Sequence, residues 1–408
     1  MNMNSPSQFR DVRTFWRQVP SEPPFLRGAN ITAAGRHNRK IILHAVRAGG
    51  EMRCGELAEL TGLTPPAVFK IARGLIEEGL VTRTRLTEKA LGQPSHALKL
   101  NPDAAFALGL NIDRDHLTLV VVNFAGQVVR KFHEATKFSR PEQVRAFVAE
   151  SVTGLKHEGG AMMSRLAGFG VAIPDDLGTT ALPGQPAGYG VWDGVSLPDL
   201  LDGIVDARIV RENDAAAAAI GEMLFGAGLE IDSFFYLFIG AGLGGGLVIG
   251  KQYVRGAHGR SGEIGFLPQI NPLRSSRTNL QNTLGDAVLT ADLLGLLRSN
   301  GHEVTLDTLD QLDEKGQAIV EHWVEAVADY LYLPLLNILC IVDPDAVLVG
   351  GVVPQSLIER LCYRISKRLS MHVGIHWPQM AVRPASVHAD PAAVGAAVLA
   401  FQGIWDGP

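Results

Sequence analysis

The chain has 408 residues, of which 46% are hydrophobic and 19% are charged. This composition is typical of a soluble globular protein of two or three domains and excludes a disordered chain. Residues 1–100 carry 15 Lys and Arg against 8 Asp and Glu, a net charge of +7, whereas the rest carries 22 against 34, a net charge of −12. This asymmetry favours a separate N-terminal module that binds a polyanion.

The sequence shows no feature of export or membrane insertion. Residues 1–30 lack a continuous apolar core, so no signal peptide is expected. The apolar run 326–342 is interrupted by Asp329 and Asn337, which argues against a membrane span. The three cysteines show no metal-ligand spacing and fit free thiols in a reducing cytoplasm: Cys54, Cys340 and Cys362. We therefore expect a cytoplasmic protein.

After an N-terminal arm (1–35), residues 36–100 have the pattern of a winged helix-turn-helix domain. Two short helical segments end at glycines, the second of them at Gly62. Thr64 suits an N-cap and Pro65 the first helical position, so a third helix is expected to run from there to Gly79. The alternating segments 80–86 and 96–100 then predict a two-stranded wing.

In such a domain the third helix enters the major groove and the wing sets cations against phosphates. The residues expected to contact DNA lie at the helix start, on its exposed face and on the wing: Thr64, Pro65, Pro66, Phe69, Lys70, Arg73, Arg83, Arg85 and Gln93. The alternative is a three-helix bundle whose solvated basic face serves a protein–protein contact.

From residue 101 onward strands alternate with helices. A strand meander, a helix at 141–157, two more strands and an Ala-rich helix from Ala215 are followed by a second strand-rich segment and further helices. This repetition predicts an α/β body of two related lobes, about 101–228 and 229–408, with a cleft between them. The stretch GAGLGGG (240–246) fits G-x-G-x-x-G, but a strand rather than a helix follows it, so it predicts a β-hairpin and not a dinucleotide site.

Three segments resemble signature segments of the ROK family (repressors, open reading frames and kinases): ENDAAAAAIGE (212–222), the stretch 240–265 and DPDAVLVGG (343–351). The N-terminal module is similar to the winged helix-turn-helix of the family's repressor branch, and the resemblance covers about residues 35–405. It implies an actin-like, sugar-kinase-type fold of two lobes. It also implies either phosphorylation of sugars with ATP or sugar-responsive regulation of operons.

The resemblance places the kinases' ATP-phosphate hairpin, D-x-G-G-T-K, at Asn111–His116. Here the Asp is replaced by Asn111, the two glycines by Asp113 and Arg114, the Thr by Asp115 and the Lys by His116. Two carboxylates would repel a polyanion, so we expect an ordinary β-turn with its charged residues in solvent. ATP binding in the kinase manner, and hence catalysis, is not expected.

The resemblance also assigns candidate ligand residues. Asp214 matches the kinases' general base, although Asn213 or Asp214 could simply cap the helix that follows. Glu263 matches a sugar-binding glutamate, with His258 near the same loop; the alternative for Glu263 is a solvated loop carboxylate. The segment around Trp192 resembles a sugar loop, but Gly188 or Tyr189 stands where Asn is usual.

Family members hold structural zinc with one His and three Cys. Here Phe266 replaces the His, residues 267–281 contain no Cys, and Gln281 replaces the usual Glu. A tetrahedral Cys₃His site cannot form without these ligands, so neither zinc nor another cofactor is expected.

The favoured interpretation is a sequence-specific repressor that binds an operator as a dimer or tetramer and responds to a sugar or sugar phosphate in the cleft. Two alternatives stay open. One is an ATP-dependent sugar kinase with a regulatory head, and the other is a DNA-binding regulator that needs no ligand.

Overall fold

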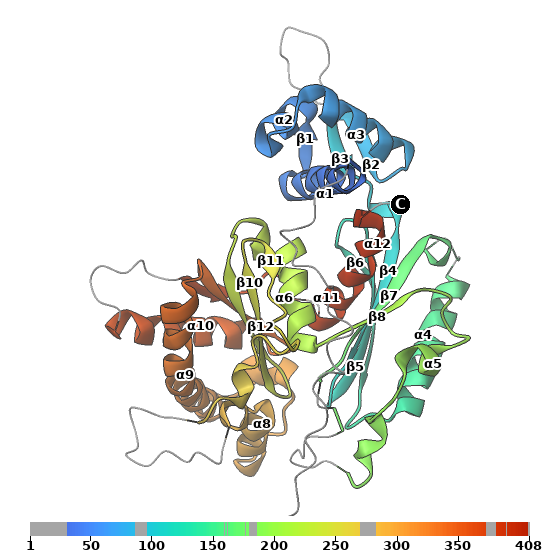
Figure 1. Cartoon of the computed structure of the whole chain (residues 1–408). Coiled ribbons are helices and arrows are strands. Elements are labelled where there is room, and N and C mark those ends of the chain that lie inside the picture. Colours follow the sequence, from blue (N-terminus) through green and yellow to red (C-terminus); the bar gives the residue numbers. More distant parts are fainter. Residues whose placement is uncertain are drawn as a thin grey trace, which may run out of the picture.

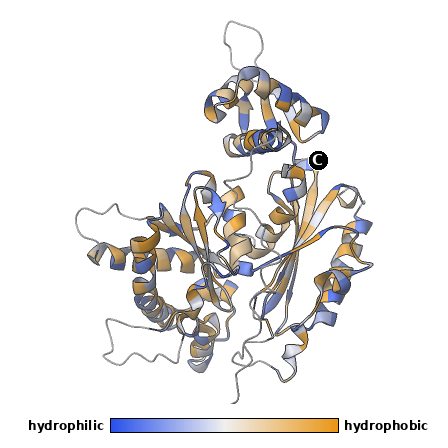
Figure 2. Ribbon diagram, viewed as in Figure 1, coloured by the Kyte–Doolittle hydropathy of each residue, from blue (hydrophilic) through white to orange (hydrophobic). Residues whose placement is uncertain are grey.

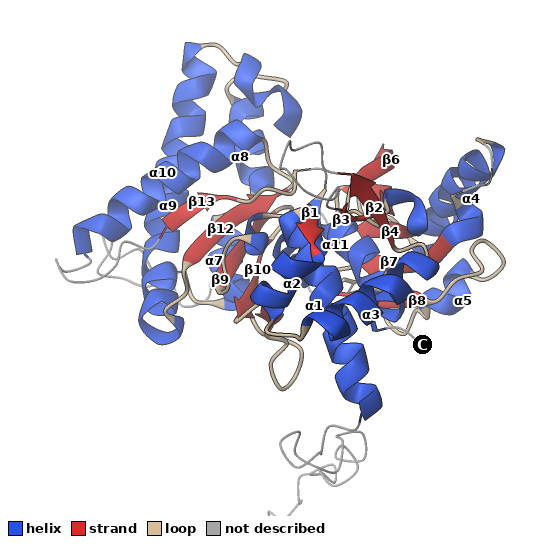
Figure 3. Ribbon diagram, turned by 90° about the horizontal axis from the view of Figure 1, so that it is seen from above, coloured by secondary structure: helices blue, strands red, loops and turns tan. Residues whose placement is uncertain are grey.

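The structure is a computed structural model. It describes residues 31–85, 96–158, 160, 162–175, 177–178, 186–269, 283–372, 381–388 and 390–406. A small N-terminal head sits on a two-lobed body (Figure 1). Seen from above, the head lies over the middle of the body, between the lobes (Figure 3).

The head contains the predicted tri-helical arrangement and wing. Its elements are α1 (Ile31–Gly49), β1 (Glu51–Arg53), α2 (Cys54–Thr61), α3 (Pro65–Glu77), β2 (Val81–Arg85) and β3 (His96–Leu100). Gly62 ends α2 in the left-handed conformation, with φ 69°, and Pro65 opens α3 as expected. Thr64 occupies the N-cap position, but its side chain makes no capping hydrogen bond. The sequence pattern missed β1, which pairs with β3 and extends the wing.

The body is built from two sheets with the same arrangement. The first has the order β6-β5-β4-β7-β8 and the second the order β11-β10-β9-β12-β13. In each, an antiparallel hairpin ribbon is continued by parallel strands. The predicted repetition of two related α/β lobes is thereby confirmed. The strands span Phe106–Ile112 (β4), His116–Asn123 (β5), Val128–Ala135 (β6), Leu166–Ala172 (β7), Ile209–Glu212 (β8), Phe234–Ile239 (β9), Leu243–Ile249 (β10), Gln252–Tyr253 (β11), Ala346–Gly351 (β12) and Ala381–Pro384 (β13).

Two small-residue helices, α6 (Asp214–Phe225) and α11 (Pro391–Ala400), pack against each other between the sheets (Figure 1). By sequence α6 precedes and α11 follows the lobe boundary expected at 228/229, yet each packs on the sheet of the other lobe. Helix α6 lies on β9 and β10 of the second lobe, and α11 lies on β4 and β7 of the first. The glycines of β10 make this possible, since a Cβ at Gly244 would stand 2.7 Å from the Cβ of Ala215. The stretch 240–246 is therefore a β-hairpin, as predicted, and its glycines admit α6.

The remaining helices are α4 (Pro141–His157), α5 (Leu197–Leu201), α7 (Leu284–Ala287), α8 (Thr290–Ser299), α9 (Glu314–Val342), α10 (Gln355–His372) and α12 (Gln402–Asp406). Of these, α4, α5, α8, α9 and α10 cover the outer faces of the lobes (Figure 1), α7 lies at a cavity between the lobes and α12 lies against the head, while hydrophobic residues concentrate on the strands (Figure 2). By length and composition α9 could span a bilayer, but half of the residues in its most apolar stretch are buried inside the protein. Its Asp329 accepts a hydrogen bond from Arg368 of α10 at 2.6 Å.

Candidate functional site

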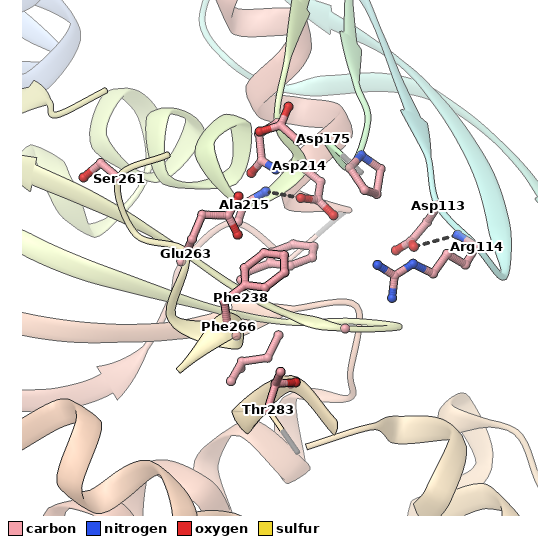
Figure 4. Close-up of a pocket in the computed structure, with 18 of the residues that line it drawn as sticks. Asp113, Arg114, Asp175, Asp214, Ala215, Phe238, Ser261, Glu263, Phe266 and Thr283 are labelled. Carbon is pink, nitrogen blue, oxygen red and sulfur yellow. Dashed lines mark hydrogen bonds between the residues drawn. The ribbon is translucent and has the colours of Figure 1, made fainter. Parts of the chain in front are cut away.

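A cavity of about 330 Å³ opens between the lobes. Six segments form its walls: the β4–β5 hairpin, the loop after β7, the N-terminus of α6, the β9–β10 glycine hairpin, the loop that follows β11 and the segment 283–289 around α7 (Figure 4). The side chains that argue for a function are Asp113, Arg114, Asp175, Asn213, Asp214 and Glu263, with Phe238 and Phe266 as an apolar side. Mixed carboxyl, amide and aromatic groups in one concave site suit a polyol ligand.

Asn213 and Asp214 combine the two roles that the sequence left open. Asn213 caps α6 by accepting a hydrogen bond from the backbone N–H of Ala216 at 3.1 Å, and Asp214 accepts one from Ala215 at 2.8 Å. Both also line the cavity. Burial, and then the nearby Asp113 carboxyl, raise the pKa of Asp214 to about 7. Asp214 can therefore either accept or donate a hydrogen bond near neutral pH.

Of the other two ligand candidates, the structure places one at the cavity and the other away from it. Glu263 is half-buried and lines the cavity, so it is not a solvated loop carboxylate. His258 is exposed and is not among the described residues that line the cavity. The loop turns at Gly259 and Gly262, both at positive φ, between the two residues, so their closeness in sequence does not bring His258 to the site.

The expectation of a solvated turn at Asn111–His116 is wrong. Asp113 and His116 do close a turn, but Asn111, Asp113 and His116 are all buried. The cause is a distant residue: Asp390, at the N-terminus of α11, receives a hydrogen bond from Asn111 Nδ2 at 3.2 Å and lies 3.3 Å from His116 Nε2. The polar end of the hairpin is thus folded against α11.

His116 is a buried cation. Its Nδ1 lies 2.6 Å from Asp115 Oδ1, and Nε2 faces Asp390. Burial alone would lower the pKa of His116, but hydrogen bonds to Asp115 and Asp390 raise it to about 10. Asp113, Asp115 and His116 place possible ligand atoms within 4.8 Å of one another. Both ring nitrogens of His116 are nevertheless engaged by carboxylates, which makes the ring an ion-pair partner rather than a metal ligand.

The sequence placed neither Asp113 nor Arg114 of this hairpin in the cavity, and of the two it is Arg114 that brings a positive charge. Its side chain points into the cavity (Figure 4), and Nη1 would lie 3.1 Å from a Cβ at Gly242. The glycine hairpin therefore faces a cation supplied by the protein itself. The one available signal was the replacement of a family glycine by arginine at the turn.

The Trp192 segment belongs to the core of the first lobe. Trp192 and Tyr189 are buried, and Trp192 Nε1 donates to the carbonyl of Ser139 at 2.8 Å. No described residue of 186–201 lines the cavity. The expected sugar loop is thus absent from the cavity wall over these residues, because the aromatic side chains pack inward. Of the zinc-site positions, Phe266 lines the cavity and Gln281 lies outside the described residues.

One ion pair beside the cavity joins the lobes. Glu212, at the end of β8, pairs with Arg255, which follows β11. Glu212 also accepts a hydrogen bond from the backbone of Asn213, the next residue and a cavity residue, at 3.1 Å. This pair is placed to hold the two walls of the cavity together, and nothing in the local sequence pattern indicated it.

The head presents a separate candidate surface. At the start and on the outer face of α3, the side chains of Thr64, Pro65, Pro66, Phe69, Lys70 and Arg73 are exposed, and so is Arg83 on β2. Phe69 is 60% exposed, and Arg73 pairs with Glu77 one turn later. Arg85 is the last residue of β2, while Gln93 lies outside the described residues. The predicted contact residues of α3 and Arg83 of the wing are therefore open to solvent.

The opposite side of the head is packed on the body. Arg47 of α1 lies over two rings of the body, 5.1 Å from the centroid of Phe225 and 5.3 Å from that of Trp405. His44 stacks on Trp405, with ring centroids 5.5 Å apart. Because Phe225 ends α6, the helix whose first turn lines the cavity also contacts the head.

Comparisons with known proteins agree with this architecture. The model of the ROK family matches residues 107–403, and that of the IclR helix-turn-helix domain matches residues 42–85. Protein y4fQ of Sinorhizobium fredii is 28% identical over 315 residues, 75% of this chain and 76% of that protein. A xylose repressor of Bacillus spizizenii is 22% identical over 386 residues, 93% of this chain and 98% of that one. A solved ROK family transcriptional regulator, a homologue of the E. coli MLC protein, superposes with a TM-score of 0.64 at 19% identity, covering 91% of this chain and 97% of its own.

Proposed function

The chain belongs to the ROK family, and we propose that it is a DNA-binding transcriptional repressor controlled by a carbohydrate-type effector. The observation that carries the proposal is the combination of one exposed, basic α3 face with a body whose interlobe cavity holds Asn213, Asp214 and Glu263. The relatives include a xylose repressor that spans nearly the same length. A sugar-linked operon is therefore the expected target.

In this mechanism α3 enters the major groove and Arg83 on the wing contacts the phosphate backbone. Effector binding between the lobes changes their closure, and the head follows because it is packed on the end of α6 and on α12. A homodimer or homotetramer would match two half-sites of an operator. The site of action would be the cytoplasm.

A kinase activity is less favoured. Asp214 stands at the cavity with a pKa near neutrality, as a general base requires. The hairpin opposite it, however, presents Arg114 and a buried carboxyl, Asp113, in place of glycines. We therefore propose a regulator without enzymatic activity and without zinc, and a regulator independent of ligand is the remaining alternative.

The test is binding of the full-length protein to DNA from upstream of its own gene, by gel shift and footprinting at several salt concentrations. Lys70→Ala and Arg83→Ala should each weaken binding several-fold and reduce the salt slope by about one unit per lost phosphate contact. Lys156→Ala, an exposed lysine on α4, is the matched control and should change neither. Salt-insensitive binding, or hexose phosphorylation that Asp214→Asn abolishes, would refute the proposal.

A further inference from the structure

Arg114 has an unusual position for an arginine in a turn. The side chain is half-buried, and its Nε is out of contact with solvent and has no hydrogen-bonding partner. Across the described part of the chain, its guanidinium makes no hydrogen bond or ion pair. Only its backbone is engaged: the N–H donates to Asp113 Oδ1 at 2.7 Å, and the carbonyl accepts from the N–H of Phe138 at 2.6 Å. A partly buried guanidinium is costly unless an acceptor meets it. The cavity is where that acceptor would arrive.

The carboxyl groups around the cavity do not serve as the acceptor that the guanidinium of Arg114 needs. The Asp175 carboxylate oxygen Oδ1 lies 3.8 Å from Arg211 Nη2. Asp286 accepts hydrogen bonds from both the backbone N–H and the hydroxyl of Thr283, each at 2.8 Å. Burial, and then Asp115, raise the pKa of Asp113, while the pKa of Asp214 is about 7. Asp113 and Asp214 therefore bind protons more readily than ordinary carboxyls, so they oppose an anion less. Among the described residues that line the cavity, Arg114 is the one cation.

We propose that Arg114 binds an acidic group, a carboxylate or a phosphate, on a carbohydrate ligand whose hydroxyl groups reach Asn213, Asp214 and Glu263. The planar guanidinium matches two oxygens of either group, and this gives both strength and orientation. Glycine at position 242 lets the guanidinium lie close against the β9–β10 hairpin, because a Cβ there would stand 3.1 Å from Arg114 Nη1. The inference rests on the proposed function and narrows its effector to sugar acids and sugar phosphates.

The experiment compares each acid with its neutral parent by calorimetry on the full-length protein at pH 7.5. The pairs are xylose with xylonate, glucose with gluconate and glucose with glucose 6-phosphate, and inorganic phosphate is added alone. Arg114→Gln removes the charge, and Arg114→Lys keeps it without the two-pronged geometry. Arg208→Gln is the matched control, since Arg208 is exposed and does not line the cavity.

At least one acid should bind about tenfold or more tightly than its neutral parent. Arg114→Gln should bring the two affinities within about twofold, Arg114→Lys should retain part of the difference, and Arg208→Gln should retain all of it. The carboxylate and phosphate pairs identify which acid is used. If Arg114→Gln does not fold, as judged by circular dichroism, the inference is tested by Arg114→Lys, which should lose part of the preference for the acid over its neutral parent.

Three results would overturn the inference: no binding by any acid of the panel, equal binding of acids and neutral parents, or a preference unchanged in both Arg114 variants. Inorganic phosphate that binds as tightly as the sugar acids would refute the carbohydrate part. A neutral sugar that binds and alters operator affinity would leave the proposed function standing and refute only this inference. An intact acid preference without operator binding would refute the function alone.

Discussion

Within the β4–β5 hairpin, His116 shows how a single side chain changes the chemistry of a site. In a D-x-G-G-T-K hairpin this position is a lysine that faces a phosphate, whereas here the cation lies between Asp115 and Asp390. The raised pKa of His116, about 10, keeps the ring charged at physiological pH. The hairpin is therefore held by an internal ion pair and needs no nucleotide to neutralise it.

Asp214 gives a prediction on pH. Its pKa is about 7 in the folded protein and about 4 in an unfolded chain, so the folded state binds more protons between these values. The free energy of unfolding therefore falls as pH rises from about 4 to 7 and is constant above. The substitution Asp214→Asn removes the titrating carboxyl group and, with it, this fall in the free energy of unfolding. Above pH 7 the variant should be more stable than the parent by about 2 kcal/mol, since one pKa unit is worth about 1.4 kcal/mol and the group is partly solvated.

Urea unfolding at pH values from 5 to 9 measures this difference, which should grow up to pH 7 and then level off. Asp206→Asn, at an exposed position outside the cavity, should show no such trend. A stability gain of Asp214→Asn that is the same at pH 5 and pH 8 would contradict a raised pKa at this residue.

Among the elements, α6 is joined to the chain around it by one buried carboxylate. Glu222 accepts hydrogen bonds from the backbone N–H groups of Ala227 at 2.8 Å, Ser386 at 2.7 Å and Val387 at 3.0 Å. Two of these belong to the segment that leads to Asp390 and α11. Glu222 thus fixes the position of α6 relative to the start of α11.

Glu222→Ala should lower the free energy of unfolding by about 3 to 4 kcal/mol, because it leaves three backbone donors without their acceptor. Thermal and urea unfolding measure the loss. Glu230→Ala, which removes an exposed carboxylate just after the short 3-10 turn (Ala227–Leu229) that follows α6, should stay within about 0.5 kcal/mol of the parent. Equal losses in both variants would mean that the Glu222 hydrogen bonds contribute little.

Elements with strong local patterns were predictable, and contacts between distant residues were not. The strand meander that begins the body and the second strand-rich segment were predicted, as were α3 and α6 through their caps and small residues. The amphipathic helix α10 was overlooked, although its buried residues follow helical spacing: Leu357, Leu361, Ile365 and Leu369. Burial of the hairpin at Asn111 depends on Asp390, 279 residues away, and no local pattern encodes such a contact.

For the molecule as a whole, α6 connects the two candidate sites. Its first residues line the cavity, and the guanidinium of Arg47 in the head lies over the ring of its last residue, Phe225. Arg47 is also enclosed by Trp405, and burial lowers its pKa to about 10. A displacement of α6 at the cavity would therefore reach the head at a contact that has little room to adjust.

Arg47→Met should uncouple the sites, because it keeps an apolar side chain against Phe225 and Trp405 but removes the cation over their rings. Operator affinity without effector, and effector affinity without DNA, should stay within about threefold of the parent. The factor by which effector changes operator affinity should drop about fivefold or more, since that factor measures the coupling free energy. Gel shifts over an effector titration measure it. Arg36→Met, at an exposed position on the same helix, should keep the full factor. An unchanged factor in Arg47→Met would show that the signal reaches the head by another route, such as the contacts of α12 with α1.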